Sequence, residues 1–375
     1  MSFDAAIQRR RAIIARAPGL NATQLARIVA LTPDLSLLEG SMRPLAALEI
    51  PARSREWLAT PDPALVDEDL HWLDRTGIAL LLSCDADYPP LLLQSPDPPV
   101  ALFVRGQVRT LADPQLAMVG SRNPTAGGRA TARDFARTFA RAGLTITSGL
   151  ALGIDAACHE GALDAGGVTI GVLGHGLDRM YPPQNALLAE RVAAAGAVIS
   201  EFPRGFEPRP AHFPQRNRII AALSLGTLVV EAAQDSGSLI TARLAGIAGR
   251  EVFAVPSSIH NTFARGCHEL IRQGAKLVER PEDVWVELKL SLSSQLLVAS
   301  AEPSKIPPAL DKEYKILLDA LAFEPASVDS LIERTGMTSE SIASMLLILE
   351  LEGHVAPHPG GRYSRMAGPA STSSA

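Results

Sequence analysis

The feature that most constrains the fold is a regular alternation of short apolar runs with helical stretches between residues 80 and 290. The runs are almost continuously apolar, which is typical of strands buried on both faces of a parallel sheet. The sequence therefore predicts an α/β domain with a doubly wound parallel sheet. Its expected strands are Leu116–Val119, Leu144–Thr147, Val168–Leu173, Ala197–Ser200, Thr227–Glu231 and Glu251–Val255.

Different patterns flank this Rossmann-like region of residues 80–290. Residues 1–75 predict a helical domain of the SAM or helix-hairpin-helix kind, in which Asn21 caps a helix. Residues 310–366 predict helices followed by a short hairpin at Gly360-Gly361, which together suggest a winged-helix-like module. Residues 291–309 are expected to form a linker, and the small polar residues 367–375 a disordered tail.

Composition limits the classes of function. A chain with 47% hydrophobic and 20% charged residues is typical of a soluble globular protein. Its net charge of −5 gives no overall attraction to nucleic acid, so any such binding must come from a local patch. Three scattered cysteines favour a reducing cytoplasm over a disulfide framework or a zinc site. No signal peptide and no apolar run of the ~18 residues that a membrane helix needs is apparent.

A locally basic motif, Phe213–Ala221, stands out in this acidic chain because it places Arg216, Asn217 and Arg218 in an apolar helical run. Arginine on a rigid element is well suited to bidentate phosphate binding. An amphipathic helix with solvated or salt-bridged arginines is the alternative. If the motif binds an anion, Arg216→Ala should weaken that binding without unfolding the chain.

Glycine-rich turns follow several of the predicted strands, at the sheet edge where open parallel sheets bind ligands. Glycine allows backbone N–H groups to approach a ligand, and a helix N-terminus favours an anion. Ser238 is also expected to cap the helix that it opens. Tight strand–helix turns without a ligand are the alternative. The turns and the basic motif supply the candidate site residues, which are Gly120, Ser121, Arg122, Gly149, Phe213, Arg216, Asn217, Arg218, Ser236, Gly237 and Ser238.

Several kinds of site find no support in the sequence. There is no G-x-x-x-x-G-K-[ST] phosphate loop and no G-x-G-x-x-G opening the first crossover. His159, His175 and His212 lack metal-ligand spacing. Asp155 and Asp178 are more typical of residues that cap helices or orient arginines. We therefore predict no catalytic residue, no cofactor and no metal.

Taken in order, the motifs of the sheet region resemble the DNA-processing protein A family (DprA, also called Smf). The chain departs from that pattern at Leu152, where many members carry a basic or aromatic residue, and at Ser257, where many have glycine. The matching stretches are Gly120–Arg122, Ser148–Asp155, Leu173–Asp178, Tyr181–Asn185, Ser200–Pro203, Phe213–Ala221, Glu231–Ala242, Arg250–Pro256 and Leu270–Ala275.

The resemblance implies a non-enzymatic cytoplasmic protein that binds single-stranded DNA during natural transformation. It implies that the protein protects incoming strands, helps to load the RecA recombinase and works as a homodimer. A sheet edge rich in N–H donors and arginines can follow a phosphate backbone without reading bases. Phe213, Phe202 and Phe206 are the candidates for base stacking.

Two other classes of function are alternatives to this one. A LOG-like phosphoribohydrolase would share the sheet, but its Pro-Gly-Gly-x-Gly-Thr motif is absent and the corresponding turn reads Asp235-Ser236-Gly237-Ser238. A regulator acting through the winged helix would need a basic recognition helix. The candidate helix, Glu340–Glu352, has three glutamates and no Lys or Arg, which is unsuited to a groove lined by phosphates.

Overall fold

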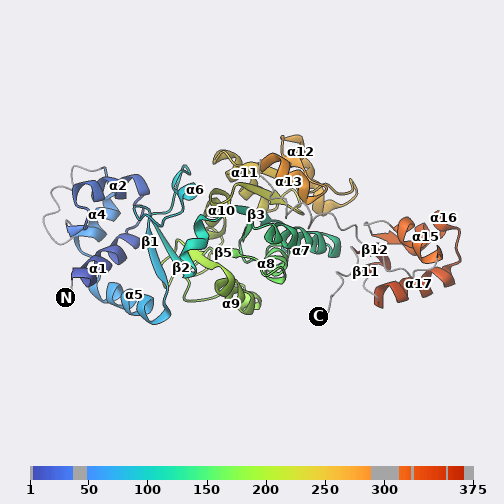
Figure 1. The fold of residues 1–375 in the computed structure, drawn as a ribbon, viewed down its shortest axis with the longest axis horizontal. Helices are drawn as coiled ribbons and strands as arrows, with labels where there is room; N and C mark the ends of the chain where they lie inside the picture. The colour runs from blue at the N-terminus through green and yellow to red at the C-terminus, as the bar shows by residue number, and fades with distance from the viewer. Residues whose placement is uncertain (1–2, 37–48, 289–311, 322–324, 352–353, 367–375) are drawn as a thin grey trace.

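The structure is a computed structural model that describes residues 3–36, 49–288, 312–321, 325–351 and 354–366. The linker predicted at 291–309 and the tail predicted at 367–375 lie outside these residues. Figure 1 shows a helical N-terminal domain, a central sheet domain and a small C-terminal module in sequence order along the long axis. This arrangement confirms the predicted fold class.

The N-terminal domain is helical, as predicted. Asn21 accepts a hydrogen bond from the backbone N–H of Gln24 and so caps the second helix. Leu25, Ile28 and other buried side chains of the domain pack into a core that reaches Leu82 at the edge of the sheet. The helices are α1 (Phe3–Ala15), α2 (Ala22–Leu31), α4 (Ala52–Ala59) and α5 (Pro63–Thr76).

The central sheet has nine strands in the order β1-β2-β6-β5-β4-β3-β7-β8-β9. In this spatial order, every neighbouring pair between β6 and β9 is parallel. The pairs β1–β2 and β2–β6 are antiparallel. The antiparallel pair was not predicted, because a run as short as Ala79–Leu82 is ambiguous between strand and helix. The strands are β1 (Ala79–Leu82), β2 (Ala101–Gly106), β3 (Gln115–Val119), β4 (Thr145–Ser148), β5 (Thr169–Leu173), β6 (Ala197–Ser200), β7 (Gly226–Val229), β8 (Glu251–Ala254) and β9 (Lys276–Leu277).

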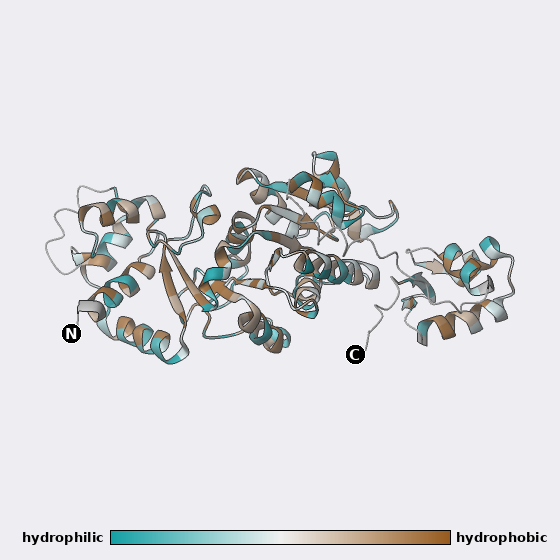
Figure 2. Ribbon diagram, viewed as in Figure 1, coloured by the Kyte–Doolittle hydropathy of each residue, from teal (hydrophilic) through white to brown (hydrophobic). Residues whose placement is uncertain are grey.

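Helices cover both faces of the sheet. One face packs against α7, α8 and α13, where Phe139 meets Trp285 with 5.5 Å between ring centroids. The other packs against α10, α11 and α12. Figure 2 shows the apolar strands between these mixed, amphipathic helices. The helices are α6 (Pro90–Leu93), α7 (Ala126–Arg141), α8 (Ile154–Asp164), α9 (Ala186–Ala195), α10 (His212–Leu223), α11 (Ser238–Ile247), α12 (Arg265–Arg272) and α13 (Pro281–Leu288).

The sequence indicates that one helix begins at Arg216 and that Ser238 caps the next, and the structure differs at both places. Helix α10 begins at His212, before Arg216, because Pro214 falls in its first turn, where a missing N–H breaks no intrahelical bond. Phe213 therefore lies on the helix. At α11 the N-cap is Gly237 and Ser238 is already helical, so the predicted cap at Ser238 is wrong by one residue.

The C-terminal module contains α15 (Lys312–Leu321), α16 (Val328–Thr335) and α17 (Ser339–Leu351). Its sheet follows the order β10-β12-β11. The strands are β10 (Ala326–Ser327), β11 (Val355–His358) and β12 (Arg362–Arg365). The hairpin turns at Gly360-Gly361, whose φ angles of 82° and 67° favour glycine. These elements form the predicted helices and wing.

The order of the parallel strands determines where a ligand can enter. Strand β3 lies between β4 and β7, so the chain leaves β3 toward one side of the sheet and later returns on the other. At such a switch point the turns after neighbouring strands diverge and leave a crevice at their carboxyl ends. Here those turns follow β3 and β7.

Candidate nucleic-acid interface

A groove of about 710 Å³ lies at this switch point. Its walls are the turn after β3, the first turn of α10 and the turn that leads into α11. It brings together most of the predicted site residues, whereas Gly149 and Arg218 do not line it. The predicted residues that line the groove are Gly120, Ser121, Arg122, Phe213, Arg216, Asn217, Ser236, Gly237 and Ser238.

Arg122 is the accessible cation of the groove. Its side chain is exposed, and the guanidinium carbon lies 5.5 Å from the ring centroid of Phe213. No carboxylate of the described residues lies within ion-pairing distance of it. Phe213 is half-buried, so one part of the ring supports the arginine and the rest faces the groove. A cation over an aromatic face in this way can meet both a phosphate and a base.

Arg216 differs, because it forms part of the groove floor. Only 4% of the residue is exposed, and Nη1 donates to the carbonyl oxygens of Gly149, at 2.7 Å, and Val172. A β-carbon at Gly149 would lie 2.6 Å from Nη2, so a larger residue there would displace the guanidinium. Burial lowers the pKa of Arg216 to about 10, and the charge of Asp155 opposes that shift. The side chain therefore holds the strand ends together.

Asp155, in the first turn of α8, is the counter-charge at the floor of the groove. Its carboxylate accepts hydrogen bonds from the backbone N–H groups of Gly149, at 3.1 Å, and Ala151, at 3.4 Å. Burial raises its pKa, and Arg216 acts in the opposite direction. This geometry matches the capping part of the expectation for Asp155, because the carboxylate caps the turn that leads into α8.

Arg218 points to other partners. Its guanidinium pairs with Glu201 at 2.6 Å and with Asp97 at 2.9 Å. Its charge is neutralised there, so this placement gives no support to the phosphate contact predicted for Arg218. The neighbouring Asn217 faces the groove and donates to the carbonyl oxygen of Gly237 at 3.3 Å, which ties α10 to the start of α11.

The turns after β3 and β7 approach each other closely. The N–H of Ser121 donates to the carbonyl oxygen of Glu231 at 2.7 Å. A β-carbon at Gly120 would lie 2.8 Å from the same oxygen, so only glycine fits. Ser236 and Ser238 share a hydroxyl hydrogen bond of 2.7 Å at the N-terminus of α11. Small residues thus expose backbone and hydroxyl groups along the groove wall, as anion sites require.

Sequence reasoning missed two exposed aromatic residues of the groove. Tyr181 is 46% exposed, and its ring centroid lies 5.9 Å from that of Phe213. Phe263 is 44% exposed at the far wall. Of the other predicted stacking residues, Phe202 is buried against His212 and Phe206 does not line the groove. Tyr181 could have been identified from the sequence, because it opens the Tyr181–Asn185 motif, which follows a predicted strand and its loop.

Within the described ranges no cluster of His, Cys, Asp and Glu side chains could hold a metal ion. Among those same residues, no helix has the length and apolar character needed to cross a membrane.

Comparison with known proteins identifies the family. Residues 79–289 match the family model of DNA recombination-mediator protein A, and residues 301–361 match the DprA winged helix domain. Protein Smf of Escherichia coli is 43% identical over 307 residues, which cover 80% of this chain and 81% of that protein. DNA processing protein DprA of Streptococcus pneumoniae is 40% identical over 256 residues, which cover 68% and 89%.

Solved structures agree with these matches. The X-ray structure of DprA from Streptococcus pneumoniae superposes with a TM-score of 0.64 at 36% identity, over 76% of this chain and 98% of that one. A second match is a structure of DNA processing protein A from Helicobacter pylori, which concerns that protein's single-stranded DNA binding mode. It superposes with a TM-score of 0.52 at 30% identity and covers 56% of this chain and 95% of that one. The chain belongs to the DNA recombination-mediator protein A family, known as DprA or Smf.

Proposed function

We propose that the groove binds the backbone of single-stranded DNA, with Arg122 on a phosphate and Phe213 against a base. The observation that carries this proposal is the exposed, unneutralised guanidinium of Arg122 held over the Phe213 ring. The hydroxyl groups of Ser121, Ser236 and Ser238 are then placed to receive the neighbouring phosphate. Arg216 and Asp155 keep the floor rigid beneath them.

The stacking surface favours a single strand over a duplex. A base can lie on Phe213 or Tyr181 only if it has left its own stack, which is inexpensive in single-stranded DNA and costly in a duplex. Stacking also tolerates every base, because each base has a π-face. Binding should therefore depend little on sequence.

Two further arginines extend the positive surface beside the groove. Arg209 precedes Pro210, which lines the groove, and Arg265 follows Phe263 by two residues. Both are exposed, and neither forms an ion pair with a carboxylate of the described residues. With Arg122 they supply charge from different parts of the chain, which suits a backbone that crosses the carboxyl edge of the sheet.

We also propose the cellular role that the resemblance to this family implies. The protein protects incoming single strands in the cytoplasm and helps to load RecA during natural transformation. It acts as a homodimer and without catalysis. The DNA-binding groove is the part of this role that the geometry supports directly.

The test is a comparison of labelled single-stranded and duplex oligonucleotides, titrated with the full chain over a salt series. Single strands should bind more tightly, and each phosphate contact should add roughly −0.7 to the log–log salt slope. Equal affinity for the two forms, or an affinity that does not respond to salt, would overturn the proposal.

A further inference from the structure

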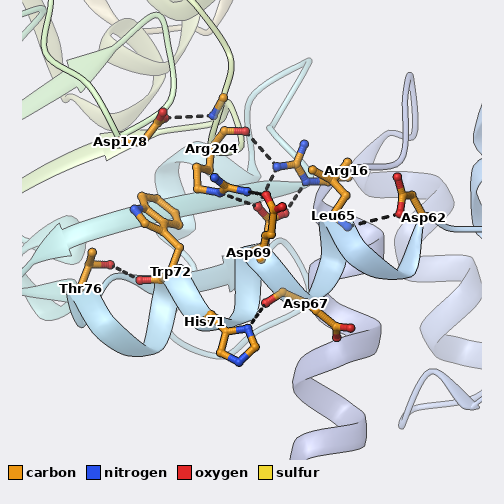
Figure 3. A network of polar contacts seen from close by, with 12 residues as sticks. Arg16, Asp62, Leu65, Asp67, Asp69, His71, Trp72, Thr76, Asp178 and Arg204 are labelled. Atoms are coloured by element: carbon orange, nitrogen blue, oxygen red, sulfur yellow. Dashed lines mark hydrogen bonds and ion pairs between the residues drawn. The ribbon is translucent and has the colours of Figure 1, made fainter.

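An ion-pair network joins the helical N-terminal domain to the loop between β6 and α10 (Figure 3). Its centre is Asp69 of α5, which is 3% exposed. The carboxylate of Asp69 accepts from Nη2 of Arg16 in α1 at 2.7 Å and from Nε of Arg204 in the loop at 3.4 Å. Arg16 also donates to the backbone carbonyl of Arg204 at 2.9 Å, and Arg204 pairs with Glu68. The loop is thus held by both its side chain and its backbone.

The same helix contacts a second loop, which follows β5. Trp72 of α5 belongs to an apolar cluster that includes Phe103 and against which Leu177 of this loop packs. Asp178, the next residue, accepts a hydrogen bond from the N–H of Gly205 at 3.1 Å, as Figure 3 shows. The two loops are therefore tied to α5 and to each other.

Both loops end in the groove. The loop after β5 leads to Tyr181, and the loop after β6 leads through Pro210 to Phe213. The two rings face each other with 5.9 Å between centroids and an interplanar angle of 38°. The contacts of α5 thus reach both loops that carry the aromatic pair.

We propose that Asp69 and Arg204 are positioning residues for the groove, through which the helical domain fixes the Tyr181–Phe213 pair without touching DNA. Loops without regular structure keep one conformation only where contacts offset their conformational entropy. Asp69 supplies such a contact from another domain, because its buried carboxylate, which also pairs with Arg16, accepts from Nε of Arg204 at 3.4 Å. This inference rests on the proposed function in one respect, that the aromatic pair stacks on bases.

The test compares Asp69→Asn and Arg204→Gln with the matched control Asp67→Asn in the full chain. Asp67 lies on the same helix, but its partner Arg9 belongs to the same domain, so the pair does not reach the loop. Both test variants should bind a labelled oligo(dT) of about 15 nucleotides more weakly, by roughly 3- to 30-fold. The salt slope should stay unchanged, since no phosphate contact is lost. The control should bind as the wild type does.

Hydrogen exchange provides a readout that needs no DNA. Peptides covering 174–182 and 201–216 should exchange faster in both test variants, while strands β3 to β5 keep their protection. Unchanged affinity in both variants, or faster exchange confined to residues 3–76, would overturn the inference. If Asp69→Asn does not fold, Arg204→Gln decides, because it leaves the Arg16–Asp69 pair in place. If the wild type fails to bind single strands, the proposed function falls, while the exchange data still decide whether the helical domain holds the loops.

Discussion

Replacing Arg122 with alanine should weaken single-stranded DNA binding and leave the folded state intact. Within the described residues the guanidinium contacts the Phe213 ring at 5.5 Å, an interaction worth about 0.5–1 kcal/mol at an exposed site. A hydrogen bond from a charged donor to a phosphate contributes about 1.5–3 kcal/mol. The affinity should therefore fall by roughly 10- to 150-fold. The log–log salt slope should become shallower by about 0.7, because one phosphate contact is lost.

Fluorescence anisotropy with labelled oligo(dT) over a salt series measures both quantities. Arg122→Lys keeps the charge and loses the planar fork, so it should retain the slope and lose only part of the affinity. Arg191→Ala is the matched control, since Arg191 is an exposed arginine on α9 that does not line the groove. The reasoning is refuted if Arg122→Ala and Arg191→Ala bind equally well with the same slope.

Three further outcomes are expected. Phe213→Ala should lose about 1–3 kcal/mol of binding free energy per stacked base with an unchanged salt slope in the same titration; an altered slope would contradict a stacking role. Arg216→Met should lower the free energy of unfolding by about 1–3 kcal/mol in urea denaturation, because the buried carbonyl oxygens of Gly149 and Val172 lose their charged donor. This revises the expectation that Arg216 can be replaced without unfolding, and a wild-type midpoint would restore it. The third outcome concerns His159, whose Nδ1 lies 2.7 Å from Thr169 Oγ1. Burial lowers the pKa of this imidazole from 6.5 to about 3. Below pH 6.5 the unfolded chain therefore binds a proton that the folded chain does not. Stability should then fall by about 1.4 kcal/mol per unit as the pH drops below 6.5, and this component of the slope should be absent in His159→Gln denatured at several pH values.

The sequence by itself determined the architecture of the sheet domain and the C-terminal module. Strands such as β5 and β6 were predicted almost to the residue, because continuous apolar runs between glycine-rich turns are local signals of buried parallel strands. The helix cap at Asn21 and the turn at Gly360-Gly361 were also predicted correctly, because a cap and a tight turn depend on nearby residues alone. The ordered motifs along these strands were also enough to indicate the family.

The tertiary structure alone decided what each arginine does. Arg122, Arg216 and Arg218 are alike as sequence, yet one is exposed over Phe213, one is buried on backbone carbonyls and one is neutralised by Glu201 and Asp97. The groups that separate them come from distant parts of the chain, such as Asp97 and Val172. The same holds for Asp69, whose contact with Arg204 spans two domains. A local pattern specifies which element a side chain occupies, whereas its burial and its charge partners depend on which other elements pack against it.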